Sequence, residues 1–137
     1  MNNTELIKIA KRAREFSCAD ISKFKVGAAL LTKNGEVISG CNIEDPSGLG
    51  VTNICAERCA VIKALSEGHT EFEKIAVVGG KNEMVSCMPC GICRQYLISF
   101  CPQIKVVCIY NDRMEEYALH ELLPHMFDER FEGIPQC

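Results

Sequence analysis

The sequence lacks the features that membrane, exported and nucleic-acid-binding proteins usually carry. No apolar run approaches the roughly 18 residues of a membrane span, and neither an apolar leader nor a lipidation motif stands at either end. The net charge of −3 comes without a stripe of lysine and arginine, so the charge pattern of a nucleic-acid binder is missing. We therefore expect a cytoplasmic protein with no membrane or nucleic-acid partner, acting on a small uncharged or cationic molecule.

The sequence also has no internal repeat, linker or low-complexity segment. Its 137 residues suit one domain, 1–137, long enough to bury about two-thirds of the surface that the unfolded chain exposes. Ten cysteines would suggest disulfides in a secreted protein. Without a leader they indicate reduced thiols, some of them buried and some bound to metal.

Apolar periodicity divides the chain into alternating helices and strands. In 4–17, Leu6, Ala10 and Ala13 share one face, whereas the basic residues, Arg14 among them, face away, which predicts an amphipathic helix. Asn34-Gly35 predicts a tight hairpin between strands at 26–32 and 36–39. Further helices are predicted at 54–65 and 90–100, strands at 75–78 and 104–110, and a short helix at 121–124. This alternation predicts parallel strand pairing with right-handed crossovers.

Three cysteines and one glutamate have the spacing of a catalytic zinc site. Cys55-Ala56-Glu57 and Pro89-Cys90-Gly91-Ile92-Cys93 each open a predicted helix, where unpaired N–H groups favour thiolates. Cys90 and Cys93 lie at i and i+3, and so on one face of their helix. Three thiolate ligands leave the fourth zinc position free for water, and Glu57 is then available for proton transfer.

The charge of such a site needs compensation. Three thiolates outweigh the charge of Zn²⁺, which weakens the ability of the metal to acidify water. The two helix N-termini supply part of the positive charge. Arg58 is predicted to donate a hydrogen bond to a zinc-bound sulfur, and Gln95 to have a similar orienting role.

Two other interpretations of these cysteines remain open from the residues alone. Cys87 could complete a four-cysteine structural site, which would make the chain a non-catalytic, zinc-stabilised binding module. Cys90 and Cys93 at a helix start are also typical of a thioredoxin-like redox pair. The first interpretation leaves Glu57 unexplained, and the second does not need Cys55.

Five segments, in this order along the chain, resemble the zinc-dependent cytidine deaminase family. They are 24–30, 40–44, 55–58, 89–95 and 122–127. They include the family signature of a cysteine or histidine, any residue and a glutamate, followed by Pro-Cys-x-x-Cys. The resemblance implies an α/β fold, a three-layer α/β/α sandwich with a mixed five-stranded sheet. It also implies a homotetramer with active sites at the subunit interfaces.

The same resemblance assigns roles to individual residues. It implies that Cys55, Cys90 and Cys93 hold one Zn²⁺ per chain and that Glu57 carries protons. The implied reaction is hydrolytic deamination of cytidine or deoxycytidine to uridine or deoxyuridine with release of ammonia, in pyrimidine salvage. The implied substrate contacts are Asn42 and Glu44 on the ribose hydroxyls, Phe24 and Ala56 beside the nucleoside, and Phe127 in a neighbouring subunit's pocket.

Two departures from the family pattern leave the substrate open. The segment 45–53 is longer than in typical members and lacks their tyrosine. Met88 stands before Pro89, where members usually carry serine or threonine. Both positions bear on the shape of the family's pocket, so a deaminase of a related aminopyrimidine nucleoside, of the blasticidin S type, remains an alternative. A polynucleotide editor is disfavoured because it would need a basic channel for the strand.

Overall fold

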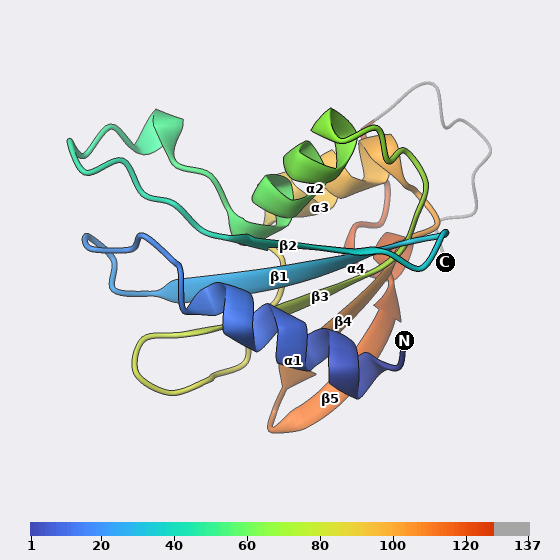
Figure 1. Cartoon of the computed structure of the whole chain (residues 1–137), viewed down its shortest axis with the longest axis horizontal. Coiled ribbons are helices and arrows are strands. Elements are labelled where there is room, and N and C mark those ends of the chain that lie inside the picture. Colours follow the sequence, from blue (N-terminus) through green and yellow to red (C-terminus); the bar gives the residue numbers. More distant parts are fainter. Residues whose placement is uncertain (128–137) are drawn as a thin grey trace.

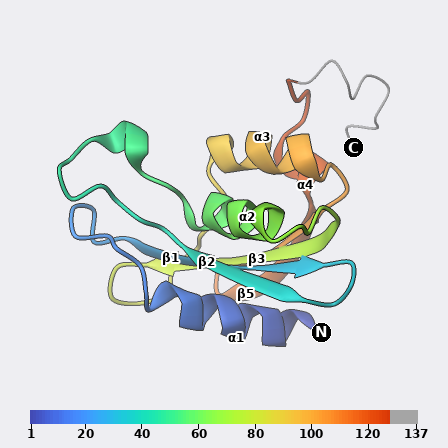
Figure 2. The same ribbon diagram turned by 45° about the horizontal axis from the view of Figure 1, so that its top comes forward.

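The computed structural model describes residues 1–127 and shows a five-stranded mixed sheet between two layers of helices (Figure 1). Helix α1 covers one face of the sheet, and α2 and α3 cover the other (Figure 2). This confirms the α/β/α sandwich that the resemblance implied. None of the helices in the described part of the chain is long and apolar enough to cross a membrane. The helices are α1 (Asn3–Arg14), α2 (Ala56–Ser66), α3 (Gly91–Phe100) and α4 (Leu119–Leu122); the strands are β1 (Lys25–Thr32), β2 (Val37–Cys41), β3 (Phe72–Gly80), β4 (Lys105–Tyr110) and β5 (Arg113–Ala118).

The strand order confirms the predicted parallel pairing for β3 and β4 but not for β2 and β3, which are not neighbours. The order is β2-β1-β3-β4-β5, and β3 with β4 is the one parallel pair among these strands. The hairpin at Asn34-Gly35 forms as predicted, with Gly35 at φ +88°, and it places β2 at the sheet edge. Because β1 separates β2 from β3, those two strands run in the same direction without being neighbours. The crossover through α2 therefore skips one strand.

Strand β5 is one that the apolar pattern does not reveal. It follows β4 through a tight turn in which Asn111 and Asp112 have φ values of 49° and 60°. Asparagine and aspartate tolerate this left-handed conformation better than most residues. The strand lies at the sheet edge and is largely exposed, so its sequence, Arg-Met-Glu-Glu-Tyr-Ala, shows little apolar alternation.

The central strands are buried on both faces, which explains their continuous apolar sequences. In β1, Leu30 belongs to the core beneath α2 and α3, whereas Leu31 belongs to the core beneath α1. In β3, Val77 and Val78 divide in the same way. A strand whose successive side chains all enter one core or the other carries no polar alternation.

Gly40 in β2 sets how closely α2 approaches the sheet. A Cβ atom at this position would lie 2.6 Å from both the carbonyl oxygen of Ala56 and the backbone nitrogen of Ala60. Any side chain here would push the first turn of α2 off the strand. Because Gly40 has no side chain, α2 can begin close to the sheet, and this sets the position of its N-cap residue Cys55.

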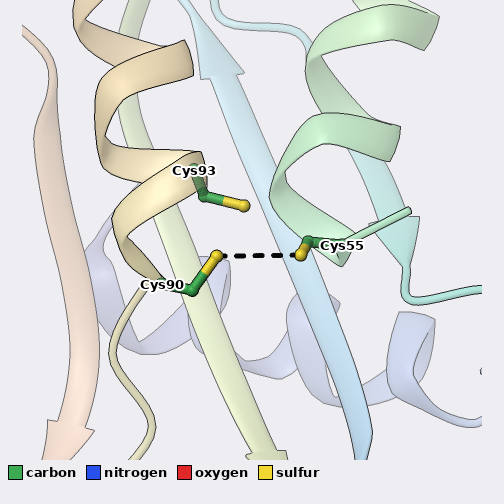
Figure 3. Close-up of side chains that lie close together, drawn as sticks. All are labelled: Cys55, Cys90 and Cys93. Carbon is green, nitrogen blue, oxygen red and sulfur yellow. Dashed lines mark hydrogen bonds between the residues drawn. The ribbon is translucent and has the colours of Figure 1, made fainter. Parts of the chain in front are cut away.

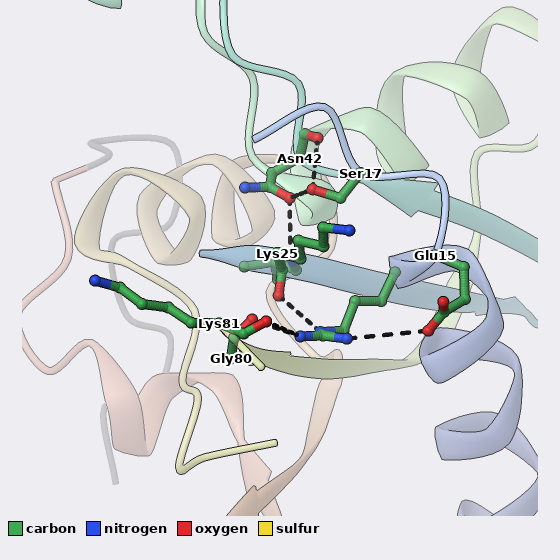
Figure 4. Close-up of polar contacts among 8 residues, drawn as sticks. Glu15, Ser17, Lys25, Asn42, Gly80 and Lys81 are labelled. Atoms are coloured by element: carbon green, nitrogen blue, oxygen red, sulfur yellow. Dashed lines mark hydrogen bonds and ion pairs between the residues drawn. The ribbon is translucent and has the colours of Figure 1, made fainter. Parts of the chain in front are cut away.

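Helix α1 ends on a buried arginine, which corrects the prediction that Arg14 faces away from the core. The guanidinium donates to the carbonyl oxygens of Lys25 at 3.1 Å, Gly80 at 2.6 Å and Lys81 at 2.9 Å (Figure 4). Lys25 and Gly80 form the last pair between β1 and β3, and Lys81 directly follows β3. Helical periodicity assigns Arg14 to the polar face, but it cannot show that carbonyl groups from the end of the β1–β3 pair surround its guanidinium.

Replacing Arg14 with methionine should destabilise the protein while keeping the apolar stem of the side chain. One buried and two partly buried carbonyl groups would lose this donor, so we expect the free energy of unfolding to fall by about 2–4 kcal/mol. Arg12, which is exposed on the same helix, is the matched control. Thermal unfolding followed by circular dichroism measures the effect. Equal melting temperatures for Arg14→Met and Arg12→Met would contradict this role of Arg14.

Candidate functional site

The three predicted thiols meet where two helices begin. Cys55 is the N-cap of α2, Cys90 is the N-cap of α3, and Cys93 lies in the first turn of α3. Their side chains point toward one another (Figure 3). The three sulfur atoms all lie within 4.8 Å of one another, and those of Cys55 and Cys90 are 3.8 Å apart. Residues 35 positions apart in sequence thus form one sulfur cluster.

The geometry of this cluster fits zinc. Zinc binds thiolates at about 2.3 Å, and a tetrahedral arrangement of such bonds separates the sulfur atoms by about 3.8 Å. The separation of Cys55 and Cys90 matches this edge length. Cys87 is not in the metal-capable group found among residues 1–127, which argues against a closed four-cysteine site. Three sulfur ligands leave one tetrahedral position for another molecule.

Positive charge surrounds the thiols, as their ionisation requires. Both helices start at the cluster, so the positive ends of two helix dipoles meet there. The pKa of Cys55 falls to about 5, mainly because of the hydrogen bond with Cys93 and then of that with Arg58. Arg58 Nη2 donates to Cys55 Sγ at 3.5 Å, which is the predicted contact. The pKa of the partner thiol, Cys93, rises because it shares that hydrogen bond and is buried.

Glu57 lies beside the sulfur cluster and is almost completely buried. Its side chain is 3% exposed, and Cys93 Sγ donates to its Oε2 at 3.6 Å. Burial removes water from the carboxylate and raises the pKa of Glu57 to about 7. A carboxyl group with such a pKa can accept and return a proton near neutral pH.

A cavity of about 280 Å³ opens onto these groups. It brings together the predicted residues Phe24, Asn42, Glu44, Ala56 and Glu57. Cys93 lies behind this lining, fully buried. Polar groups and an apolar wall share the cavity surface. The complete lining is Phe24, Val26, Asn42, Glu44, Asn53, Ile54, Cys55, Ala56, Glu57, Cys87, Met88 and Cys90.

Asn42 holds the polypeptide that forms one side of the cavity. Its Nδ2 donates to the carbonyl oxygen of Phe24 at 2.8 Å, and its Oδ1 accepts from the backbone nitrogen of Val26 at 2.8 Å. The hydroxyl of Ser17 donates to the same Oδ1 (Figure 4). The amide oxygen is therefore already occupied twice, so Asn42 can offer a ligand an N–H group. Its contact with ribose stays a prediction.

Glu44 likewise combines a structural contact with a place in the cavity. Its Oε1 accepts from the backbone nitrogens of Ile21 and Ser22, both at 3.1 Å. These contacts lower the pKa of Glu44, with the hydrogen bond to the Ser22 side chain contributing most. Glu44 is therefore ionised at neutral pH and can accept a hydrogen bond from a ligand hydroxyl.

Gln95 makes its hydrogen bonds with the backbone of Phe127, and an orienting role toward the metal ligands stays a prediction. Its Nε2 donates to the carbonyl oxygen of Phe127 at 2.7 Å, and its Oε1 accepts from the nitrogen of the same residue at 3.3 Å. Gln95 is two positions beyond Cys93 on α3, so it projects from a different face of the helix. Phe127 itself is 89% exposed and lies outside the cavity lining. Its contact with a neighbouring subunit stays a prediction.

Two further residues support the site and had no predicted role. Arg94 donates through Nε to the carbonyl oxygen of Pro89 at 2.7 Å and through Nη1 to that of Leu122 at 2.8 Å. It thus fixes the entry to α3. Asn53 lines the cavity, and its Oδ1 accepts from the nitrogen of Asp45 at 2.6 Å, which closes the loop 45–53. Arg94 adjoins the second motif, whereas no local sequence signal marks Asn53.

Known proteins resemble this chain over most of its length. A profile of the cytidine and deoxycytidylate deaminase zinc-binding region matches residues 1–110. A cytidine deaminase of Halalkalibacterium halodurans is 46% identical over 129 residues, 93% of this chain and 95% of that protein. A blasticidin-S deaminase of Bacillus cereus is 31% identical over 126 residues, 88% of each chain.

The fold agrees with these sequence relationships. The crystal structure of a cytidine deaminase from Burkholderia pseudomallei superimposes with a TM-score of 0.82 at 42% identity, covering 93% of this chain and all of that one. A thioredoxin-like redox role for Cys90 and Cys93 finds no support in these similarities. By sequence, by fold and by its zinc-binding thiols, the chain belongs to the cytidine and deoxycytidylate deaminase family.

Proposed function

We propose that this chain hydrolyses cytidine and deoxycytidine to uridine and deoxyuridine, releasing ammonia, in the salvage of pyrimidine nucleosides. The observation that carries the proposal is the buried carboxyl group of Glu57 beside three metal-binding thiols, at a cavity of nucleoside-binding size. A zinc site with a purely structural role would not need this carboxyl group. The relatives named cytidine deaminase support the same reaction.

One zinc ion per chain would be held by Cys55, Cys90 and Cys93. Bound there, zinc would acidify a water molecule and so supply a nucleophile for C4 of the pyrimidine at neutral pH. Arg58 reduces the negative charge of the thiolates through its hydrogen bond to Cys55. With less negative charge on the thiolates, a bound zinc ion would be a stronger electrophile than it would be without Arg58.

Glu57 moves the protons of the reaction. It takes one proton from the attacking water and delivers it to N3 of the ring, which makes C4 a better target. It then takes the proton of the new C4 hydroxyl group and delivers it to the leaving amino group, so that the C4 carbonyl forms and ammonia departs as a neutral molecule. Its pKa of about 7, caused by burial, suits both directions of transfer.

The remaining cavity residues would hold the nucleoside. Asn42 donates a hydrogen bond to a ribose hydroxyl, and the ionised Glu44 accepts a hydrogen bond from one. Phe24 and Ala56 supply apolar contact beside them. This division of donor and acceptor follows from the hydrogen bonds that the two polar side chains already make within the protein.

A second candidate substrate is a related aminopyrimidine nucleoside of the blasticidin S type. The loop 45–53 and Met88 differ from the family pattern, and Asn53 of this loop and Met88 both line the cavity. The similarity to a blasticidin-S deaminase keeps this candidate open. Ammonia release from a panel of cytidine, deoxycytidine, cytosine and blasticidin S separates the two proposals.

The proposed assembly is a homotetramer of single-domain chains, 1–137, with Phe127 entering a neighbouring pocket. The exposure of Phe127 supports it, because 89% of this large apolar residue is open to solvent in the single chain. The proposed location is the cytoplasm. All nine cysteines within residues 1–127 are free thiols, which a reducing compartment maintains. Cys137 lies outside the described residues.

The substitution Glu57→Gln should keep zinc and lose turnover. The amide has the shape of the carboxyl group but cannot carry protons, so we expect kcat on cytidine to fall by about 10²-fold to 10⁴-fold. Metal analysis and ammonia release measure the two properties. Glu67→Gln, at the other end of the same helix, is the matched control and should have normal kcat. A Glu57→Gln protein with nearly normal turnover would refute the proposed role.

The tetramer proposal makes a separate prediction for Phe127. Light scattering should give four times the mass of one chain, and Phe127→Ala should raise KM for cytidine by about tenfold with zinc content unchanged. Phe16→Ala is the control, because Phe16 is 77% exposed, follows the end of α1 and lies outside the cavity lining. The mass of a single chain, or an unchanged KM, would contradict the proposal.

A further inference from the structure

Met88 lies at the cavity beside the metal ligands. It is one of the lining residues and is only two positions before Cys90, which also lines the cavity. The carbon that loses its amino group must come to the metal, because the metal supplies the nucleophile. Met88 is therefore at the end of the cavity where the amino group of a substrate has to lie.

The backbone around Met88 is fixed on both sides. On one side, the nitrogen of Cys87 donates to the carbonyl oxygen of Ile109 at 3.2 Å, at the end of β4. On the other side, Arg94 donates to the carbonyl oxygen of Pro89 at 2.7 Å. The proline also confines Met88 to extended backbone conformations. The Met88 side chain therefore leaves the backbone from a fixed position.

The thioether of Met88 is docked on a buried thiol. Cys108 Sγ in β4 donates to Met88 Sδ at 3.2 Å, and Cys108 is fully buried. Burial raises the pKa of Cys108, so the S–H group remains a donor at neutral pH. Methionine is usually a flexible filler of space. Here the thioether of Met88 is held by Cys108, so the side chain has one position and forms a fixed part of the cavity wall.

We infer that Met88, docked on Cys108, is a specificity-determining residue that limits the space around the 4-amino group. This inference rests on the proposed function and narrows its substrate class to nucleosides with an unsubstituted 4-amino group. A substituent on that nitrogen meets the Met88 side chain. Cys108 is a positioning residue, because it acts through Met88 and does not line the cavity.

N4-methylcytidine is the probe that tests the inference. The wild-type protein should prefer cytidine, and Met88→Ala should raise the relative kcat/KM for N4-methylcytidine by about tenfold, the lower range for one methyl group in an apolar pocket. The readout is the ratio of kcat/KM for N4-methylcytidine to kcat/KM for cytidine, so a general loss of activity in Met88→Ala does not affect it. If Met88→Ala and the wild-type protein have the same relative kcat/KM for N4-methylcytidine, the inference is refuted.

Variants of Cys108 separate positioning from general packing. Cys108→Ala removes the hydrogen-bond donor to Met88, so it should raise the relative kcat/KM for N4-methylcytidine, as Met88→Ala does. Cys108→Ser keeps a donor and should retain the wild-type preference for cytidine. Cys101→Ala is the matched control, since Cys101 is a buried thiol that donates to the Leu97 carbonyl oxygen and lies outside the cavity. If Cys101→Ala relaxes selectivity as much as Cys108→Ala does, the assigned role of Cys108 fails.

Binding to catalytically disabled protein distinguishes failure of this inference from failure of the proposed reaction. Calorimetry with Glu57→Gln protein gives Kd for cytidine and N4-methylcytidine without turnover. The ratio of the two Kd values should narrow about tenfold when Met88→Ala is added. If wild-type protein releases no ammonia but this ratio of Kd values narrows, the proposed deamination is refuted and the role of Met88 in limiting the space around the amino group is supported. If the ratio of the two Kd values does not narrow, or if neither nucleoside binds, the proposed role of Met88 is refuted.

Discussion

The meeting of two helix N-termini at one point is the constraint on which the rest of the structure depends. Helices α2 and α3 both begin at a cysteine, so the positive ends of their dipoles and their unpaired N–H groups surround three sulfur atoms. Thiolates in water would lose hydration on entering such a site. Here the helix starts and Arg58 replace part of that hydration, which makes a three-thiolate zinc site possible.

The position of Glu57 follows from the same constraint. Because α2 starts at Cys55, a residue two positions later lies in the first helical turn, next to the metal ligands and beneath the cavity. Its burial is then unavoidable, and burial raises its pKa into the range useful for proton transfer. One helix start thus supplies both a metal ligand and the group proposed to move protons.

Polar side chains hold the irregular segments that complete the cavity. Asn42, Arg14 and Arg94 each bind backbone carbonyl oxygens where regular secondary structure ends. Such carbonyls would otherwise be buried without a donor, which is costly. These contacts fix the segments on either side of the site, around Phe24 and Pro89. The precision of the pocket therefore depends on residues that lie outside the metal centre.

The sequence predicted the metal site well because its chemistry depends on short spacings. Cys55, Glu57, Cys90 and Cys93 could be placed on helix starts without knowing the fold, and the structure brings the three thiols together as expected. The burial of Arg14 and the contacts of Gln95 could not be predicted, because their partners are distant in sequence. Strand β5 cannot be predicted from its apolar pattern for a different reason: as an exposed edge strand it needs little apolar alternation.

A zinc titration of metal-free protein tests the central claim most directly. We propose that one zinc ion, bound by three thiols beside Glu57, gives this chain its cytidine deaminase activity. Ammonia release from cytidine should therefore be absent without metal, rise in proportion to added zinc, and level off at one zinc ion per chain. Full zinc binding without ammonia release from cytidine or deoxycytidine would contradict the account.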